Sequence, residues 1–281
     1  MKQKFTEKHP VFGLLFYTYA GFIISEFLVG IIITFILYNR GVNQETAVAF
    51  GGCVGAILVL AIWYLKNRKE YHFMPRKGDI SGTIKLTILP MLIYWVLLFS
   101  SYAVFCKGFP FASIGPKEFF MALMAGLVEE ICFREIAVSY MAKRWMSEKR
   151  IPLIAIISGV MFGLTHITNI TSLTDIAGVL YQVLLCVFMG VFYSAIYLRK
   201  GNVWVICLFH FLHDFLVFMS VAGLAAHGST DLPDWIMVYI AVIEFGLCVY
   251  GFFLIRKAKR QEIVDLWKYK WSRDTAEAEE E

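Results

Sequence analysis

Eight long apolar runs divide this chain of 281 residues, and each is long enough, or nearly so, to span a lipid bilayer. A spanning helix needs about 20 mostly apolar residues, and helices satisfy the backbone hydrogen bonds that lipid cannot. Hydrophobic residues make up 59% of the chain, against roughly 45 to 50% in average soluble domains. The sequence therefore predicts an all-α fold, a polytopic transmembrane helical bundle of about eight spans. The runs lie at about residues 11–37, 46–65, 86–106, 118–141, 151–168, 175–198, 203–225 and 235–255.

Lys and Arg residues alternate between the connections, and this alternation predicts the orientation. They crowd the N-terminus and every second connection after it, whereas the intervening connections hold only Arg40, Lys107 and Lys117. Cytoplasmic connections of membrane proteins carry an excess of Lys and Arg, so both termini are expected in the cytoplasm. We expect a transmembrane bundle over residues 1–255 and a cytoplasmic tail over residues 256–281, first basic and then acidic.

The net charge of +4 follows from this topology and does not indicate nucleic-acid binding. No basic stripe with interleaved aromatic residues lies outside the membrane boundary, so no nucleic-acid partner is expected. Residues 256–273 mix basic with apolar and aromatic side chains, which predicts a helix lying on an anionic membrane surface. Residues 274–281 are acidic and are expected to be disordered. The six cysteines are scattered singly, a pattern that indicates neither a disulfide framework nor a zinc site.

Three ionisable residues, Glu129, Glu130 and Arg134, stand within the fourth apolar run. An ionised side chain at the bilayer centre costs roughly 2.5 to 3.5 kcal/mol, so such groups need internal partners or a water-filled cavity. Residues four apart share a helix face, which predicts an ion pair between Glu130 and Arg134 that fixes the helix rotation. Glu129 then points elsewhere, and we expect its carboxylate to face a cavity.

The fifth and seventh runs supply candidate partners. Phe162 and His166 are four residues apart in the fifth run, so they share one face. His210 and Asp214 are four apart in the seventh, so they can act on one object, or the aspartate can orient the histidine ring. A buried carboxylate beside imidazoles indicates acid–base chemistry. The two histidines differ in nominal depth by roughly 10 Å, which tilted or staggered helices would have to absorb.

Three motifs, each on its own predicted span and in this order along the chain, resemble those of the CPBP family of intramembrane proteases. They are Glu-Glu-x-x-Phe-Arg from Glu129, Phe-x-x-x-His from Phe162 and His-x-x-x-Asp from His210. The family includes the CAAX prenyl endopeptidases of eukaryotes and bacterial proteins of the bacteriocin self-immunity (Abi) type. The resemblance covers about residues 118–220, which it marks as the catalytic core.

The resemblance implies an intramembrane endopeptidase that hydrolyses a peptide bond of a membrane-associated peptide or protein, prenylated or bacteriocin- or pheromone-like. It implies that Glu129 activates the attacking water, with Glu130 and Arg134 completing the motif. His166 and His210 would be the paired histidines of the site. We accordingly expect a multi-pass protein of the cell membrane, in a bacterial plasma membrane.

Asp214 stands where the family has Asn or Asp. An asparagine amide can donate a hydrogen bond to a tetrahedral oxyanion, but an ionised aspartate cannot. Asp214 would have to be protonated, orient His210 or bind a metal. Two histidines and a carboxylate, here His166, His210 and Glu129, also match a catalytic zinc shell with one open position, so a divalent metal such as zinc is an alternative cofactor. The His-Glu-x-x-His motif of zinc proteases is absent, and glutamate-dependent hydrolysis is slightly favoured.

Two other functions would place the same residues inside a bundle. A proton-coupled transporter would use them as a relay, although the inverted repeats and matching broken helices of transporters are not evident here. A catalytically inert scaffold or immunity protein would keep them as a polar network. Glu26 and Glu244, outside the matched region, are read as interior or boundary groups with local partners. The substrate, the scissile bond and the oligomeric state are not indicated by the sequence.

Overall fold

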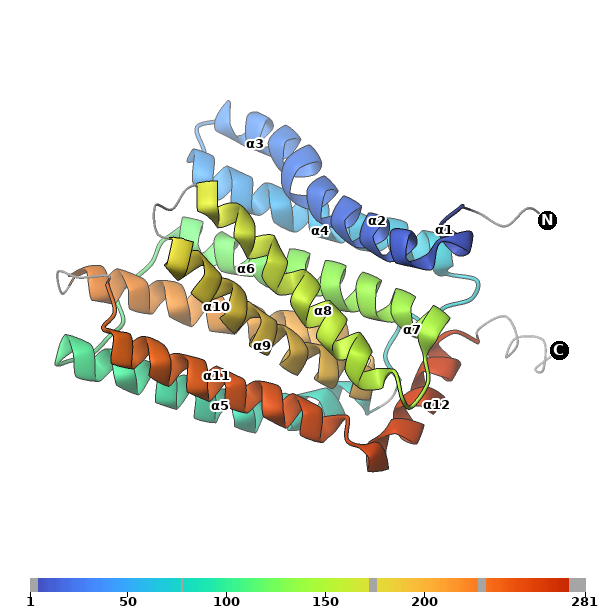
Figure 1. Cartoon of the computed structure of the whole chain (residues 1–281). Coiled ribbons are helices and arrows are strands. Elements are labelled where there is room, and N and C mark those ends of the chain that lie inside the picture. The colour runs from blue at the N-terminus through green and yellow to red at the C-terminus, as the bar shows by residue number, and fades with distance from the viewer. Residues whose placement is uncertain (1–4, 77, 172–175, 227–230, 273–281) are drawn as a thin grey trace.

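A computed structural model describes residues 5–76, 78–171, 176–226 and 231–272 of the chain. The chain is 85% helical, and the described residues contain no strand. The helices lie roughly parallel or antiparallel along one long axis, and both ends of the chain lie at the same end of the bundle (Figure 1). The predicted all-α bundle is confirmed.

The helical elements follow one another with short connections. They are α1 (Phe5–Lys8), α2 (Pro10–Ile23), η1 (Ile24–Val29), α3 (Gly30–Tyr38), α4 (Gln44–Asn67), α5 (Asp79–Cys106), α6 (Pro116–Glu130), η2 (Ile131–Val138), α7 (Ser139–Trp145), α8 (Ile151–Thr165), η3 (His166–Thr171), α9 (Ile176–Lys200), α10 (Val203–Ala226), α11 (Asp234–Leu254), η4 (Lys257–Lys259) and α12 (Arg260–Lys270).

Seven helical segments among the described residues are long and apolar enough to cross a membrane. The remaining predicted span, 118–141, is also helical, because α6, η2 and α7 run on without a break. It is not one of the seven, since it carries Glu129, Glu130, Arg134 and Glu135. The multi-pass membrane architecture is confirmed, whereas the count of eight spans stays a prediction.

Two segments of these helices are π-helical, η1 and η2. A π-turn accommodates an extra residue, which shifts the face that the following side chains present, and such turns are frequent at functional sites. Glu26 lies within η1, and η2 begins directly after Glu130. Both segments therefore lie where a carboxylate enters an apolar interior.

Glycines bring α8 and α9 into close contact beside η2. A Cβ added at Gly190 would lie 2.7 Å from the Cα of Gly159, and one added at Gly163 would lie 2.8 Å from the Val183 carbonyl oxygen. Small residues at such positions let helix backbones approach closely, which is the main source of packing energy between helices in lipid. The close approach places the backbone of α9 within reach of side chains from η2.

Helix α5 continues through Pro90, which lies inside it. Proline has no N–H, so it cannot bond the carbonyl of Leu86, four residues earlier. The hydroxyl of Tyr250 from α11 donates to that carbonyl at 3.4 Å. An unbonded carbonyl is costly in lipid, and the neighbouring helix therefore compensates for the proline.

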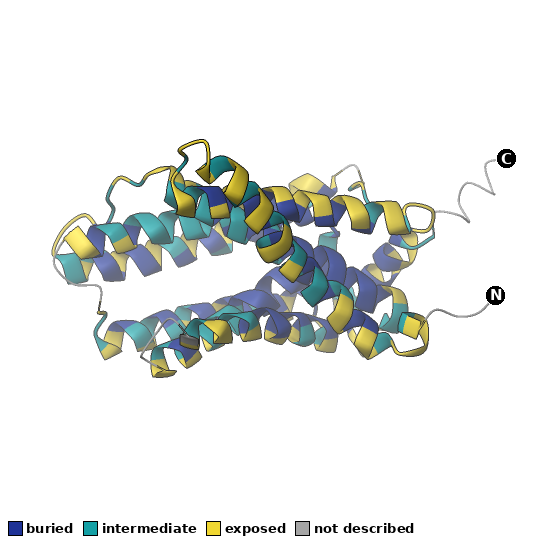
Figure 2. Cartoon of the chain, turned by 90° about the horizontal axis from the view of Figure 1, so that it is seen from above, coloured by how far each residue is buried: buried dark blue, intermediate teal, exposed yellow. Residues whose placement is uncertain are grey.

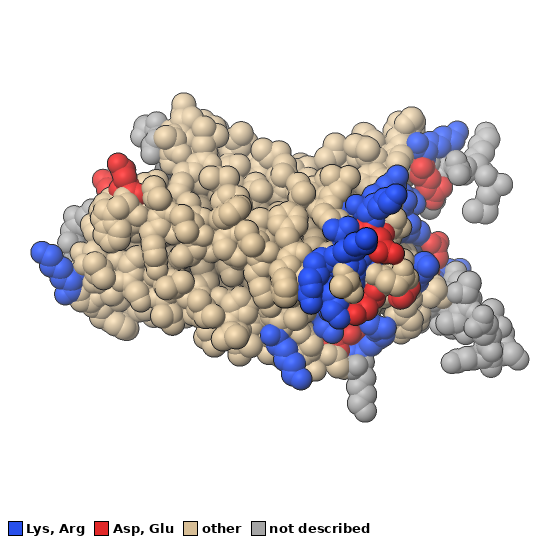
Figure 3. Space-filling model, turned by 60° about the horizontal axis from the view of Figure 1, so that its bottom comes forward, with Lys and Arg blue, Asp and Glu red and all other residues tan. Residues whose placement is uncertain are grey.

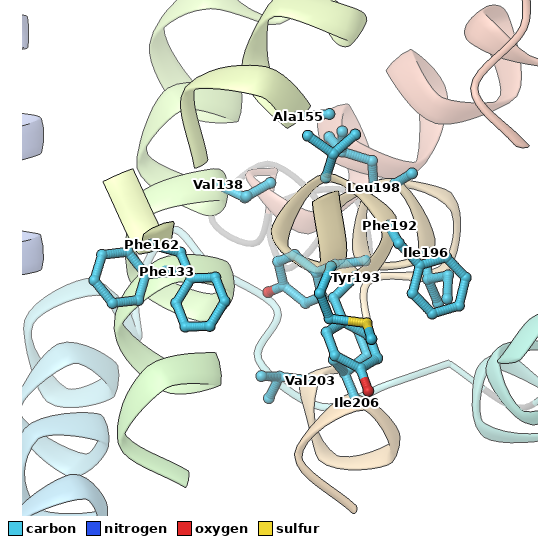
Figure 4. Packing of buried hydrophobic residues seen from close by; sticks show 14 of the residues in the cluster. Phe133, Val138, Ala155, Phe162, Phe192, Tyr193, Ile196, Leu198, Val203 and Ile206 are labelled. Carbon is cyan, nitrogen blue, oxygen red and sulfur yellow. The ribbon is translucent and has the colours of Figure 1, made fainter. Parts of the chain in front are cut away.

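Buried residues gather in the half of the bundle nearer the chain ends, as Figure 2 shows. Every residue from Ile131 to Ala142 is buried, and so is every residue from Met189 to Leu198. Figure 4 shows Tyr193 and Ile196 of α9 with Val203 and Ile206 of α10 within this cluster. The opposite half is more open.

The tail helix α12 differs from the expected surface helix. Its apolar residues Ile263, Leu266 and Trp267 are buried against the protein and do not face outward. The indole of Trp267 donates to the Leu198 carbonyl at 3.0 Å, and that of Trp271 donates to the Ser139 carbonyl at 3.1 Å. The helix thus bonds a carbonyl near the end of α9 and one at the start of α7, interactions that its amphipathic pattern alone could not distinguish from membrane binding. Residues 274–281, expected to be disordered, lie outside the described residues.

Candidate active site

A cavity of about 600 Å³ opens among α5, α6, α8, α9, α10 and α11, in the open half of the bundle. Glu129, His166, His210 and Asp214 all line it, together with Phe162. Glu130 and Arg134 lie behind its wall and are fully buried. The structure thus brings the predicted site residues from three helices into one place.

The Glu130 carboxylate lies between Arg134 and His210. Its Oε1 atom is 2.9 Å from Arg134 Nη1 and 2.6 Å from His210 Nδ1. The predicted ion pair along the helix is confirmed. The bond to His210, 80 residues later, had no signal in the sequence, and it makes Glu130 the carboxylate that holds the imidazole ring.

Arg134 connects this pair to α9. Its Nη2 atom donates to the carbonyl of Gly190 at 3.3 Å, and its guanidinium lies over the rings of Phe162 and Tyr193 at 4.7 and 5.8 Å. The close contact of α8 with α9 makes that carbonyl reachable. Arg134 is therefore held by a carboxylate, a carbonyl and two aromatic rings, all out of contact with water.

The ring of His210 has two distinct sides. Because Glu130 is paired with a guanidinium and an ionised carboxylate only accepts hydrogen bonds, Nδ1 donates to it. The Nε2 atom then faces the cavity, 3.4 Å from Glu129 Oε2 and 3.7 Å from Asp214 Oδ2. Tyr193 stacks on the ring at 5.6 Å with an interplanar angle of 23°. The arrangement presents one imidazole nitrogen to two carboxylates at the edge of the cavity.

His166 reaches the same cavity from the end of α8. Its ring meets that of Phe162 edge-on at 5.2 Å, and the ring of His210 also meets that of Phe162 edge-on, at 5.9 Å. The predicted shared face of Phe162 and His166 is confirmed. Phe162 thus contacts both histidines, and all three side chains line the cavity despite the difference in depth expected for the histidines.

Sequence reasoning missed other residues that line this cavity. Glu244 of α11 accepts a hydrogen bond from the hydroxyl of Tyr94 at 2.7 Å, as a group with a local partner was expected to do. Glu26 of η1 also lines the cavity. His213 lines it as well and faces the indole nitrogen of Trp95 at 3.4 Å. Glu26 and Glu244 lie on helices that carry none of the three motifs. His213 occupies an unspecified position between His210 and Asp214 of the third motif, so no motif could identify any of these residues.

A metal ion was the alternative cofactor, with Glu129, His166 and His210 as its ligands. Among the described residues, no three His, Cys, Asp or Glu side chains are arranged as a group that could hold one. Both rings use Nδ1 within the protein, His210 for Glu130 and His166 for the hydroxyl of Thr165 at 3.3 Å, which leaves only Nε2 of each ring to meet a bound group. The misfit therefore lies in the spacing of the three side chains and not in these bonds. The observed donor set does not fit the predicted metal shell.

Comparison with known proteins bears on the same part of the chain. Residues 116–216 match the family described as Rce1-like, type II CAAX prenyl endopeptidase. The match covers all three motifs, including His210 and Asp214 of the third. It confirms the resemblance to a CPBP family protease. Comparison with curated proteins finds no match. Comparison with solved structures finds none either.

Proposed function

From the match of residues 116–216 to the Rce1-like family, we propose that this protein is an intramembrane endopeptidase that uses Glu129 to activate water. The family match supports a CAAX-type intramembrane protease in general. The observation that carries the finer proposal is the pair formed by Glu129 Oε2 and His210 Nε2, 3.4 Å apart at the wall of a cavity within a membrane bundle. The substrate is a membrane-associated peptide or protein, and the bilayer is its route to the site.

The first step is attack by water. The ionised Glu129 carboxylate takes a proton from a water molecule, and the resulting hydroxide forms a bond to the carbonyl carbon of the scissile peptide. The negative charge then moves to the carbonyl oxygen. In this scheme His166, whose ring packs edge-on against Phe162, donates a hydrogen bond to that oxygen.

The second step expels the amine. The proton held by Glu129 passes over 3.4 Å to His210 Nε2, and the imidazolium delivers it to the amide nitrogen as the carbon–nitrogen bond breaks. Glu130 at Nδ1 and Asp214 near Nε2 stabilise the positive ring in the interval, because unlike charges attract strongly away from water. The products are one carboxylic acid, which keeps the second proton of the water, and one amine, and Glu129 and His210 return to their starting states.

Asp214 has a limited role in this scheme. An ionised aspartate cannot donate to the oxyanion, and Glu130 already orients the ring at Nδ1. Asp214 therefore acts as a counter-charge for His210 and not as its orienter. Cleavage in this scheme requires the Glu129 carboxylate. In an inert scaffold, by contrast, the same residues would hold helices together without chemistry.

The proposal is tested by replacing Glu129 with glutamine. Peptides from the membranes and medium of cells carrying wild-type protein or Glu129→Gln are compared at equal protein levels. We expect a defined set of cleavage products to disappear in the variant. Glu118→Gln is the matched control, since Glu118 lies on the same helix outside the cavity and a glutamine oxygen can still accept its bond from Gly115 N. Identical peptide profiles for wild type and Glu129→Gln, with a phenotype still caused by deletion, would favour the scaffold.

A transporter gives a different result in the same cells. Glu129→Gln would then leave peptide profiles unchanged but would alter proton-coupled uptake of a solute. No repeat of the helix arrangement is apparent among the described elements. The protease remains the function that the geometry supports best.

A further inference from the structure

The cavity occupies only one half of the bundle. On α9 its lining residues run from Tyr181 to Met189, while the stretch from Gly190 to Leu198 is buried in the core. On α5, which runs antiparallel to α9, the lining residues run from Tyr94 to Tyr102, in the last part of the helix. The cavity therefore reaches toward the end of the bundle where α5 ends and α9 begins.

The opposite end of the bundle is closed. The tail helix α12 lies across it, and the ammonium group of Lys270, which is 3% exposed, donates to the Gly201 carbonyl at 2.9 Å. Just inside, the hydroxyl of Tyr197 donates to the carboxylate of Glu135 at 2.5 Å. The lining of the cavity does not reach this end, which is filled by packed side chains and bonded carbonyls among the described residues.

The closed end is also the basic end. On the face that Figure 3 shows, Lys and Arg side chains gather mainly at one end of the molecule, where the chain ends also lie. The segments that carry them include 66–77, 143–150 and 256–260. Because basic connections stay in the cytoplasm, the closed end is cytoplasmic, and the cavity faces the other side of the membrane.

A pair of amides lies on the open side of the cavity. Asn169 follows His166 by three residues in the 3-10 helix η3, so the two side chains lie one above the other. The Nδ2 atom of Asn169 donates to Gln182 Oε1 of α9 at 2.9 Å, and both residues line the cavity. Amide side chains donate and accept hydrogen bonds, as a peptide backbone does. Such a pair is suited to an extended peptide lying between the opening and His166.

We infer that the cavity receives its substrate from the non-cytoplasmic side of the membrane, as a peptide segment whose backbone binds to Asn169 and Gln182. The substrates are accordingly exported or membrane-inserted peptides that present the scissile bond at that face. Its peptide-binding part rests on the proposed protease function. Its sidedness part rests only on the cavity, the closed end and the charge distribution.

Sidedness is tested by labelling single cysteines in intact cells. Cys106 and Cys186, the two half-buried cysteines, are replaced by serine, and either Gln182→Cys or Ser147→Cys is added. Ser147 lies exposed in the basic connection after α7, so it is the matched control for the closed end. We expect a membrane-impermeant maleimide to label Gln182→Cys in intact cells, and to label Ser147→Cys only after the cells are permeabilised.

Other labelling patterns would overturn the inference. Labelling of Ser147→Cys in intact cells, with Gln182→Cys labelled only after permeabilisation, would reverse the orientation. A Gln182→Cys protein that stays unlabelled under both conditions would show that the cavity is not open at that face. None of these outcomes depends on proteolysis, so the sidedness can fail while Glu129→Gln still abolishes cleavage, and the reverse also holds.

The amide pair is tested with a peptide identified as a product source by the Glu129→Gln comparison. Loss of neutral hydrogen bonds to the substrate backbone in Gln182→Leu is expected to raise KM by roughly fivefold while kcat changes by less than about twofold. Gln182→Asn, which keeps an amide, is expected to recover part of the loss. An unchanged KM in Gln182→Leu, whether or not kcat falls, would show that Gln182 does not bind the substrate.

Discussion

Arg134 carries a charge that the fold must compensate fully within the bundle. Its side chain is 0% exposed, as is that of Glu130, its partner at 2.9 Å. Removing one member of a buried ion pair leaves the other charge uncompensated, which costs about 3 to 5 kcal/mol. The arginine therefore contributes to stability mainly by preventing that penalty, and only secondarily through its own contacts.

We predict that Arg134→Met lowers the free energy of unfolding by about 3 to 5 kcal/mol, because Glu130 is left as a buried charge with only His210 beside it. The measurement is unfolding of the purified protein in detergent micelles. Lys117→Met removes the cation of an exposed pair with Glu45 and is expected to cost less than about 1 kcal/mol.

The double variant Glu130→Gln, Arg134→Met separates the charge effect from lost packing. It is expected to be more stable than Arg134→Met alone, because no unpaired carboxylate remains. Equal stability of the single and double variants would mean that the contacts of the guanidinium with Gly190, Phe162 and Tyr193, and not the charge of Glu130, dominate the loss.

Local spacing predicted part of this site and could not have predicted the rest. The four-residue separation of Glu130 and Arg134 is a property of any helix, so their pairing followed from the sequence. The bond from Glu130 to His210 depends on how α6 packs against α10, and no local rule specifies that. For the same reason the sequence left open whether Asp214 orients His210, whereas in the structure Glu130 occupies Nδ1 and Asp214 lies nearer Nε2.

At the scale of elements, the contact between α8 and α9 determines where Arg134 can bond. A Cβ at Gly190 would meet Gly159 Cα at 2.7 Å, Gly159 O at 3.1 Å and the Phe162 ring at 3.1 Å. Two of these atoms belong to a backbone that cannot move aside without separating the helices. The aromatic ring that lies between the two histidines is the third neighbour.

We predict that Gly190→Ala destabilises the protein by about 1 to 3 kcal/mol, because the added methyl group overpacks the helix contact. Gly246→Ala is the control, since a Cβ at Gly246 meets nothing within 4 Å. That substitution is expected to be neutral or to stabilise by up to about 1 kcal/mol through helix propensity. Thermal unfolding of both variants in the same detergent measures the difference, and a Gly190→Ala protein as stable as Gly246→Ala would contradict the packing argument.

Apolar periodicity predicted the helices but not their π-helical segments or the placement of the last one. A π-turn adds one residue to a turn without changing composition, so η1 and η2 leave no mark in a hydropathy pattern. The amphipathic residues of α12 suit either a membrane surface or a protein surface. Only the bonds from the indoles of Trp267 and Trp271 to the carbonyls of Leu198 and Ser139 show that α12 packs on the protein.

At the scale of the whole molecule, α12 joins segments that lie far apart in the sequence. Its Lys270 backbone carbonyl accepts a hydrogen bond from His72 N at 2.8 Å, in the connection between α4 and α5. The side chain of the same residue reaches Gly201, between α9 and α10. The closed end thus depends on one buried lysine, whose charge is costly to keep away from water.

Burial lowers the pKa of Lys270 below its ordinary value of 10.5, although the charges of Glu135 and Asp79 oppose that shift. Between the lowered pKa and 10.5 the folded protein binds fewer protons at this site than the unfolded chain does. Stability from this residue therefore rises with pH across that window, and at lower pH the cost of the buried charge is present in full.

We predict that the unfolding temperature of the wild type, measured relative to that of Lys270→Met, rises as the pH increases from 7 toward 10.5. The methionine keeps much of the apolar stem but has no proton to lose. Lys268→Met removes an exposed lysine from the same helix and controls for the loss of a positive charge. A wild-type advantage that falls with pH would mean that the ammonium–carbonyl bond to Gly201 outweighs burial. The closed end would then be held by that charge, and raising the pH would loosen it.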